Sequence, residues 1–178
     1  MKLPLWHAFG EVLAGWSRVE LERAEDGLAQ MHDGFAEFRA TRSGYHLPYL
    51  LGRLAEAQAR LGKMEEGRQT IERALEIVDR SGDQSWESDL YRLNGDLLLS
   101  LARREEAEQS LRSAIAIARK QEARSLELRA SLSLARLWCE ERKYAQAQAL
   151  VQPVYDWFTE SFDTADLRDA RTLLQQMC

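Results

Sequence analysis

The chain has 178 residues, enough for one ordinary domain with a buried core, and its 45% hydrophobic and 30% charged content is typical of a globular protein. A net charge of −5 argues against a nucleic-acid-binding surface, and no apolar run approaches the roughly 18 residues of a membrane helix. The N-terminus lacks the apolar core of a signal peptide, and Cys139 and Cys178 lack a metal-type spacing, so we expect a cytoplasmic protein without a disulfide framework.

Helical periodicity runs along the whole chain, whereas alternating β-branched runs and Asn-Gly turns are absent. We expect four helix pairs followed by one closing helix, joined by short loops that make neighbouring helices antiparallel. The predicted helices cover approximately residues 4–21, 23–41, 47–61, 64–80, 86–101, 105–121, 126–141, 144–159 and 165–177.

Several residues mark the predicted helix ends. Pro4 and Pro48 lie in first turns, where a missing amide hydrogen costs nothing. Gly82 suits a left-handed C-cap, and Ser85 and Ser125, which are 40 residues apart, suit N-caps. These signals support helix pairs that repeat along the chain.

Pro153 lies inside the second helix of the fourth pair. A proline there removes one backbone hydrogen bond and crowds the carbonyl of Ala149, which predicts a kink. We expect the kink to direct residues 155–158 onto the end of the stack.

Small residues recur at a step of 40. Three rows of four positions are Gly or Ala in eleven of the twelve cases: Gly15, Ala55, Gly95, Ala135; Gly27, Gly67, Ala107, Ala147; and Gly34, Ala74, Ala114, Val154. Two antiparallel helices approach to 8–10 Å only where the contact residues are small, so the rows predict the contact lines within the pairs. We name this set the small-residue ladder.

The ladder is an internal repeat, and repeats of this length are typical of helical solenoids. An apolar row at the same step accompanies it: Met31, Ile71, Leu111 and Val151. Since one pair alone cannot bury its apolar face, the pairs must stack. We therefore predict an all-α fold, a right-handed α-solenoid of four helix pairs plus a C-terminal capping helix, forming one domain over residues 1–178.

The pattern resembles tetratricopeptide repeats. In that family a small residue lies in helix A, another lies early in helix B, and a third lies two turns later. The turns at Gly62–Gly67 and Arg142–Ala147 match well. The standard repeat has 34 residues and this one has 40, which implies longer helices and connections.

A closer resemblance covers almost the whole chain. Residues 126–138 and 154–167, with Gly15-Trp16 and Tyr91–Leu93, are similar to the C-terminal repeat region of large bacterial signalling proteins. Those proteins join an adenylate/guanylate cyclase or a DNA-binding domain to an ATPase module and then to tetratricopeptide repeats. The chain has neither a phosphate-binding loop nor a cyclase carboxylate pair. The resemblance therefore implies a scaffold or sensor module.

In tetratricopeptide repeats the A helices build a concave groove. The 40-residue register places eleven candidate binding residues in it: Val12, Trp16, Glu20, Tyr49, Glu56, Arg60, Arg92, Asp96, Arg129, Leu132 and Arg136. An extended or helical peptide fits such a groove, with its acidic groups near the arginines. The row Trp16, Glu56, Asp96, Arg136 lacks the repeated Lys/Asn set that captures C-terminal carboxylates.

Two functions remain open at this point. The first is a non-catalytic protein-interaction module of a signalling protein, whose partner is a peptide or an ATPase or cyclase domain of the same or a neighbouring chain. The alternative is a small-molecule sensor with a pocket near Trp16 and Tyr49. Neither interpretation requires nucleic acid, a membrane or a cofactor.

Catalytic and metal sites find little support. His7, His32 and His46 are spaced too widely for a helical or turn-based metal site. The acid pairs Glu65/Glu66, Glu105/Glu106 and Asp163/Asp166 fall in predicted first turns, where carboxylates meet the positive end of the helix dipole. We expect no enzyme activity and no bound metal.

The two ends of the predicted stack differ. The closing helix has a polar side with Arg168, Asp169, Arg171 and Gln175, as a terminal cap requires. The N-terminal end instead presents Leu3, Leu5, Trp6 and Phe9. We therefore expect self-association through the N-terminal end, or cover by a preceding domain.

Overall fold

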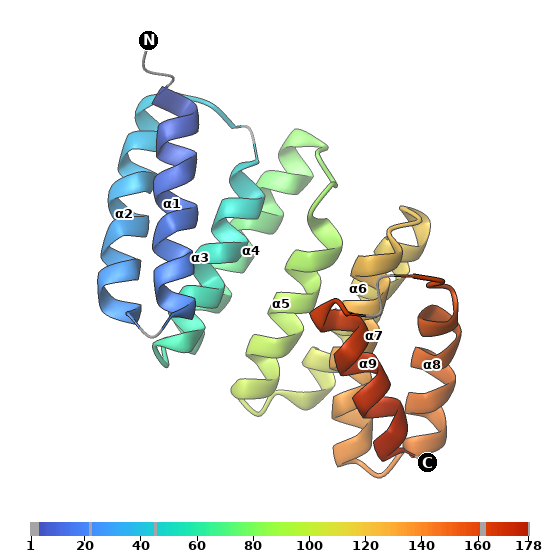
Figure 1. Ribbon diagram of the computed structural model, residues 1–178. Coiled ribbons are helices and arrows are strands. Elements are labelled where there is room, and N and C mark those ends of the chain that lie inside the picture. The colour runs from blue at the N-terminus through green and yellow to red at the C-terminus, as the bar shows by residue number, and fades with distance from the viewer. Residues whose placement is uncertain (1–3, 22, 45, 161–162, 178) are drawn as a thin grey trace. The chain divides into compact units, whose positions relative to one another are not determined.

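The structure, a computed structural model, describes residues 4–21, 23–44, 46–160 and 163–177. Within these ranges the chain forms α-helices and no strand, which confirms the all-α prediction (Figure 1). The helices are α1 (Pro4–Glu20), α2 (Ala24–Ala40), α3 (Leu47–Arg60), α4 (Met64–Ser81), α5 (Glu87–Ser100), α6 (Arg104–Lys120), α7 (Arg124–Glu140), α8 (Tyr144–Asp156) and α9 (Ala165–Gln176).

The chain divides into two compact units. Unit 1 spans Met1–Trp86 and contains α1 to α4, whereas unit 2 spans Glu87–Cys178 and contains α5 to α9. Each unit is described by itself below. The prediction of a single domain over residues 1–178 stays a prediction.

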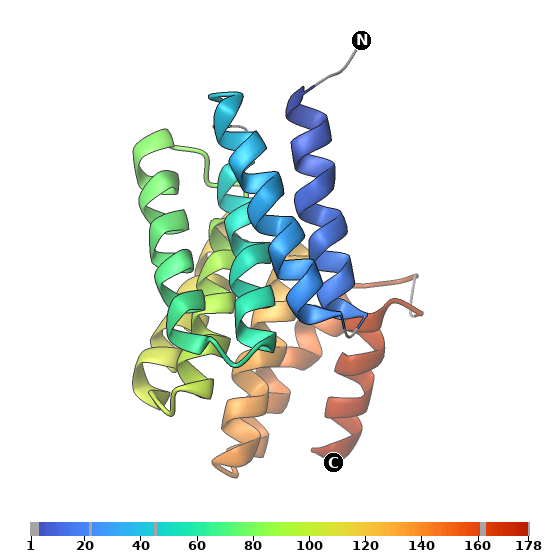
Figure 2. The same cartoon turned by 90° about the vertical axis from the view of Figure 1, so that its left-hand side faces the viewer.

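Unit 1 consists of two helix pairs. The partners in each pair pack on one another, α1 on α2 and α3 on α4, and α3 also packs on α1 and α2 (Figure 2). The largest fully buried side chains of this unit include Met31, Phe38, Leu50 and Ile71. The apolar row that accompanies the ladder therefore lies in the core.

Unit 2 repeats this arrangement and adds α9. Helix α5 packs on α6 and α7 on α8, while α7 contacts both helices of the preceding pair and α9 contacts both α7 and α8. One hydrophobic cluster joins these helices, and α9 contributes Leu167, Ala170, Leu173 and Leu174 to it. The closing helix thus covers one end of this core.

The small-residue ladder lies at the helix contacts. A Cβ atom added to Gly15 would meet the Gly27 carbonyl oxygen at 2.7 Å, and one added to Gly34 would meet the Val12 amide nitrogen at 2.9 Å. At Gly95 the Cβ atom would lie 2.6 Å from the Leu111 side chain. These distances confirm that the ladder permits the close approach of paired helices.

The turns that end the helices repeat one backbone conformation. Gly62 and Gly82 have φ angles of 76° and 71°, and Ala102, Glu122 and Arg142 adopt the same left-handed region. After Gly62, the amide of Lys63 donates to the Gln58 carbonyl, which closes a Schellman turn. The predicted left-handed cap at Gly82 is confirmed.

Some predicted helix ends were wrong. Helix α7 begins at Arg124, so Ser125 lies inside the helix and is not its N-cap, and α5 begins only at Glu87. Helix α8 continues through Pro153 and ends at Asp156, short of residue 159. Ser161 and Phe162, which belong to the sequence similarity noted above, lie outside the described residues, as does Leu3.

Candidate functional site

In unit 1, α1 and α3 bring together Trp16, Tyr49 and Glu56 of the predicted groove, around a residue that the prediction missed. The guanidinium carbon of Arg53 lies 5.5 Å from the Trp16 ring centroid and 5.2 Å from the Tyr49 ring centroid. The Nη1 atom of Arg53 lies 2.8 Å from Oε2 of Glu56. A guanidinium between two aromatic rings is a cation–π arrangement that holds both rings in place.

The spacing of residues along α3 explains why these side chains meet. Tyr49, Arg53, Glu56 and Arg60 recur every three or four residues, so they follow one side of the helix. Arg53 is only 9% exposed, although arginine is rarely buried unless it is paired. The spacing to Tyr49 and Glu56 was the available sequence signal for including Arg53.

The same side of α1 and α3 ends in an ion pair. Nη2 of Arg60 donates to Oε2 of Glu20 at 2.6 Å, and the two side chains keep 56% and 31% of their surface exposed. An exposed pair of this kind contributes little to folding but fixes the orientation of both charges. We name the surface formed by Trp16, Glu20, Tyr49, Arg53, Glu56 and Arg60 the α1–α3 face.

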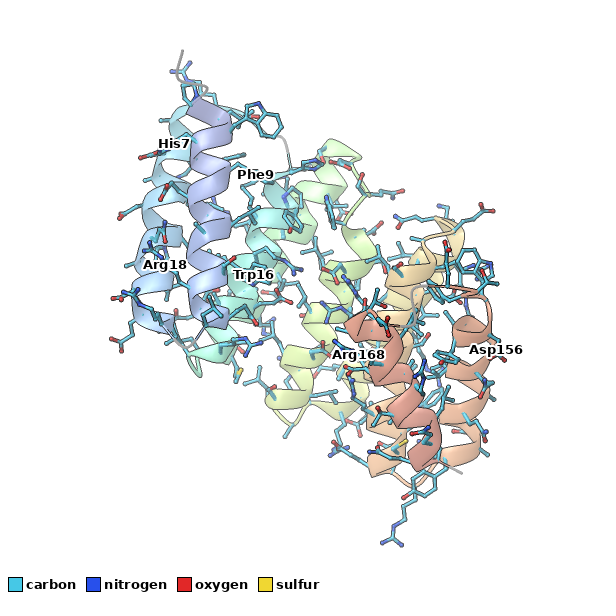
Figure 3. All side chains as sticks on the ribbon, viewed as in Figure 1. His7, Phe9, Trp16, Arg18, Asp156 and Arg168 are labelled. Carbon is cyan, nitrogen blue, oxygen red and sulfur yellow. The ribbon has the colours of Figure 1, made fainter. Side chains whose placement is uncertain are left out.

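An aromatic row continues from Tyr49. The ring centroids of Phe9 and Tyr49 lie 6.4 Å apart, and those of Tyr49 and Trp86 lie 4.4 Å apart. Nε1 of Trp86 donates to Nδ1 of His46 at 3.4 Å. Figure 3 shows Phe9 and Trp16 on the side of α1 that faces α3. The aromatic side chains of unit 1 therefore extend the α1–α3 face toward the start of α3.

Val12 and Leu132 do not line an open surface. Val12 is fully buried, with its amide close to Gly34 of α2, and Leu132 is 3% exposed inside the core cluster of unit 2. The prediction that they lie on an exposed groove was wrong. The 40-residue register places equivalent positions on the same helix side but does not tell how deeply each one is buried.

In unit 2, Arg92 joins two carboxylates of its own helix. Its Nε atom lies 2.8 Å from Oδ1 of Asp89, and Nη1 lies 2.8 Å from Oδ2 of Asp96. Burial raises the pKa of the Asp96 carboxyl, while Arg92, the Ser133 hydroxyl and Arg136 act in the opposite direction. The predicted groove residues of α5 are therefore engaged with one another.

The predicted basic end of the groove is neutralised inside unit 2. Nε of Arg129 donates to Oδ2 of Asp166 at 2.6 Å, and Nη2 of Arg136 donates to Oδ2 of Asp169 at 3.0 Å. Both carboxylates belong to α9. Acidic groups of the chain itself therefore lie where an acidic ligand was expected.

A cavity of about 590 Å³ lies beside the N-terminal end of α9. The segment Trp157–Glu160, part of the bacterial signalling resemblance, forms one wall, and the Trp157 and Phe158 rings meet edge to face at 5.1 Å. The other lining residues are Ser125, Leu128 and Arg129 of α7 and Thr164–Leu167.

Metal sites and membrane helices are absent from the part of the chain that the structure describes. No group of three or more His, Cys, Asp or Glu side chains there could hold a metal ion, and no helix there combines the length and apolar character needed to cross a bilayer. His7 instead contacts Glu37, and Glu65, Glu66, Glu105 and Glu106 lie in first helical turns, as predicted. Asp163 precedes α9, so its assignment to a first turn was wrong.

Residues 47–120 match the family model described as tetratricopeptide repeat. The match covers less than half of the chain, and this part of the chain is similar to tetratricopeptide repeats. Tetratricopeptide repeats generally mediate protein–protein interactions and are typically non-catalytic scaffolds. None of the curated proteins matches the chain.

Solved tetratricopeptide structures share the fold. A protein of Podosopora anserina described as a kinesin light chain with nearly identical TPR-like repeats has a TM-score of 0.74 at 16% identity, over 99% of this chain and 87% of that one. A Signal Transduction ATPase with Numerous Domains from Pyrococcus horikoshii, which has a tetratricopeptide repeat sensor, has the same TM-score and identity. This chain covers 26% of the length of that ATPase and is covered itself to 98%. At this identity the likeness shows the fold alone.

Proposed function

We propose that the chain is a non-catalytic, cytoplasmic interaction module of a bacterial signalling protein, and that it binds a peptide or a partner domain through the α1–α3 face. The observation that carries the proposal is the position of Arg53 between Trp16 and Tyr49. Tryptophan, tyrosine and arginine are the residues that most often carry binding energy at protein interfaces. Here the three are held together before any partner arrives.

Preorganisation favours binding because immobilising rotamer-rich side chains on association costs free energy. The rings of Trp16 and Tyr49 keep partial exposure, and Glu20 and Arg60 supply charges of both signs beside them. The buried indole N–H of Trp16 has no hydrogen-bond partner among the described residues, a feature that is rare in stable cores. The proposed partner is therefore a segment with an apolar anchor and flanking charges.

The comparisons and the sequence resemblance support a choice of partner class. A tetratricopeptide sensor occurs in the ATPase of Pyrococcus horikoshii, and the sequence resembles repeat regions that follow ATPase modules. An ATPase or cyclase domain of the same or a neighbouring chain is thus the proposed partner domain. We propose a secondary contact surface in unit 2, formed by Arg92, Asp96, Arg129 and Arg136. It binds a partner only when charged groups of that partner replace the internal ion pairs of these residues.

A peptide-display selection on the purified chain tests the proposal. For an enriched peptide we expect Tyr49→Ala and Arg60→Glu each to weaken binding about tenfold or more, as loss of an interface anchor does. The control Arg73→Glu changes an exposed arginine of α4 outside the face and should leave affinity unchanged. Equal affinity for all four proteins would contradict the proposal.

The small-molecule alternative has a different place in the structure. The space between Trp16 and Tyr49 holds the Arg53 guanidinium, so a ligand there would have to displace it. The 590 Å³ cavity beside Trp157 and Phe158 lies within the range of about 300–1,000 Å³ common for ligand sites. A thermal-shift screen on wild type and Ser125→Trp, which places a large side chain at an exposed position of the cavity wall, tests this second proposal, because a bound ligand stabilises only the protein that still has the site.

A further inference from the structure

The side of α1 that faces away from α2 and α3 carries no charged side chain. At about 100° per residue, six positions fall within a sector of roughly 100°: Trp6, Gly10, Leu13, Ala14, Ser17 and Leu21. Trp6 is 52% exposed and Leu21 is 76% exposed, and the amide of Leu21 still bonds to the Ser17 carbonyl, so the helical turn continues to it. We name these six positions the α1 outer face.

The opposite side of α1 is also apolar, since it buries Ala8, Val12, Gly15 and Val19. A helix at a protein surface normally has charged or polar residues opposite its buried side, and a helix that is apolar all round is normally buried. The α1 outer face therefore has the composition of a contact surface.

The repeat shows what this face does elsewhere. In α3 and α7 the positions equivalent to the centre of this face are buried, as are Ala170 and Leu174 in α9, and each of these helices packs on the helix pair that precedes it. The equivalents of Gly10, Ala14 and Ser17 are Leu50, Leu54 and Ala57 in α3 and Ala130, Leu134 and Leu137 in α7, all at most 8% exposed. Helix α1 has the same face with no helix pair on it among the described residues.

We propose that the α1 outer face packs against the same face of a second copy of this chain, with the two α1 helices antiparallel. The face is symmetric in size about the midpoint between Leu13 and Ala14. Trp6 and Leu21 are equally far from this midpoint, and so are Gly10 and Ser17. An antiparallel pair therefore sets the large Trp6 against Leu21 and the small Gly10 against Ser17, which is the self-complementarity that a twofold interface needs.

Two features favour an identical helix over other occupants. At the position of Ala14, the helices that receive a helix pair offer a leucine, which is Leu54 in α3, Leu134 in α7 and Leu174 in α9, and the small Ala14 instead suits the close approach of one helix. A head-to-tail contact with the far end of the chain is disfavoured, because α9 exposes Arg168, Asp169 and Gln175, with Arg168 marked in Figure 3. Burying those charges against an uncharged face would cost free energy.

The expected dimer is weak. Seventeen residues at about 1.5 Å each span roughly 26 Å, and one helix face of that length buries less than the about 800 Å² per partner of a standard interface. A dissociation constant on the order of 10–100 μM is therefore expected, and the dimer should separate on dilution.

Sedimentation velocity on wild type, Gly10→Glu and Ala36→Glu tests the association. A Cβ at Gly10 meets nothing within 4 Å, so the substitution does not disturb the fold of the monomer, while Ala36 is exposed on α2 and serves as the control. Between about 5 and 500 μM, wild type and Ala36→Glu should shift from 20.5 kDa toward twice that mass, and Gly10→Glu should stay monomeric. A monomeric wild type at the highest concentration, or equal association of Gly10→Glu, would overturn the proposal.

Disulfide trapping tests the antiparallel orientation. In a Cys139→Ser/Cys178→Ser background, Ala14→Cys lies next to the twofold axis and should form a covalent dimer. Gly10→Cys alone should not, because two copies of residue 10 would be separated by roughly 10 Å along the helices, beyond disulfide reach. A mixture of Gly10→Cys and Ser17→Cys proteins should cross-link. Self-cross-linking of Gly10→Cys as fast as Ala14→Cys would mean parallel helices and would reject this arrangement.

Discussion

Two glycines of α1 differ in what surrounds them. A Cβ at Gly15 would lie 2.7 Å from the Gly27 carbonyl oxygen and 2.8 Å from the Met31 amide, both backbone atoms, whereas a Cβ at Gly10 meets nothing within 4 Å. We expect Gly15→Ala to destabilise the protein by about 1–3 kcal/mol, because α1 and α2 must move apart. Gly10→Ala should stabilise it by up to about 1 kcal/mol through helix propensity. Urea unfolding measures the free energy of unfolding of both variants. If Gly15→Ala were no less stable than Gly10→Ala, the close contact of α1 and α2 would be refuted.

Asp96 gives a pH dependence whose sign can be worked out. Burial raises its pKa above the ordinary value of 3.8, so folding favours the protonated carboxyl. The associated stability is complete below pH 3.8 and is lost as the pH rises through the raised folded-state pKa. With 39% of the side chain exposed and Arg92 beside it, the effect is moderated by water and by the ion pair.

We therefore expect Asp96→Asn to match or exceed wild-type stability at pH 7 and to lose that advantage near pH 4. Arg92 keeps its contact with Asp89 in the variant. Denaturant unfolding at both pH values is the measurement, with Asp79→Asn at an exposed position of α4 as the control. An advantage that grew on acidification would contradict the direction of the pKa shift.

At the residue scale, the sequence predicted helix sides better than burial. The 40-residue register placed Trp16, Tyr49 and Glu56 on the same side, and the structure brings them together. It missed Arg53, because hydrophobic periodicity does not predict an arginine at a buried position. Only the contacts with its aromatic neighbours explain why Arg53 is buried there. It also gave no means to see that α9 supplies partners for Arg129 and Arg136, since that requires knowing where α9 packs.

At the element scale, the turn after α5 has a residue under strain. Ala102 has a φ of 59°, in the left-handed region, where the same turn after α3 has Gly62. The amide of Arg103 donates to the Leu98 carbonyl, so the turn closes regardless of this strain. Left-handed backbone costs an alanine about 1–2 kcal/mol. A glycine avoids this cost, but part of the gain in stability is lost because glycine has more conformational freedom in the unfolded chain.

We expect Ala102→Gly to raise stability by about 0.5–1 kcal/mol, equivalent to a melting midpoint higher by about 1–4 °C. The matched control is Ala36→Gly, the same substitution at an exposed position inside α2, which should lower stability by about 0.5–1 kcal/mol. Differential scanning calorimetry compares the two. A loss at Ala102 as large as at Ala36 would show that the turn is not strained.

The sequence predicted the presence of each helix, whereas it did not predict all of the helix ends. Glycine marked the turns at Gly62 and Gly82 because it adopts the left-handed backbone conformation without a steric cost. Ser85 and Ser125 were misleading, because the Ser85 hydroxyl donates to Oδ1 of Asp83 and α7 starts one residue before Ser125. At Pro153 the helix continues for three more residues, since one lost backbone bond does not by itself end a helix that is packed on its neighbours.

At the scale of the whole molecule, the division between Trp86 and Glu87 can be tested. Unit 2 has a hydrophobic cluster of its own that joins helices α6 to α9, including Leu128, Trp138 and Leu174. We expect the separate fragment Glu87–Cys178 to be helical and to melt cooperatively, because nearest-neighbour contacts supply most of the stability of a helical repeat.

Circular dichroism of that fragment and of Met1–Trp86 provides the measurement. If both fragments were unfolded alone and became helical only when mixed, the chain would behave as one domain over residues 1–178. The sequence favoured this single-domain interpretation because the 40-residue step runs through residue 86 without a linker. A repeat in the sequence does not tell how strongly the packing between consecutive repeats stabilises them.

The Arg53 contact has a spectroscopic consequence. Trp16 is one of five tryptophans, and its indole ring lies against a guanidinium whose charge shifts the energy of the excited state. The emission difference between wild type and Trp16→Phe therefore isolates a signal from the α1–α3 face without any attached dye. A ligand that draws Arg53 away from Trp16 would change the wavelength of that emission, so the chain carries its own optical readout of occupancy.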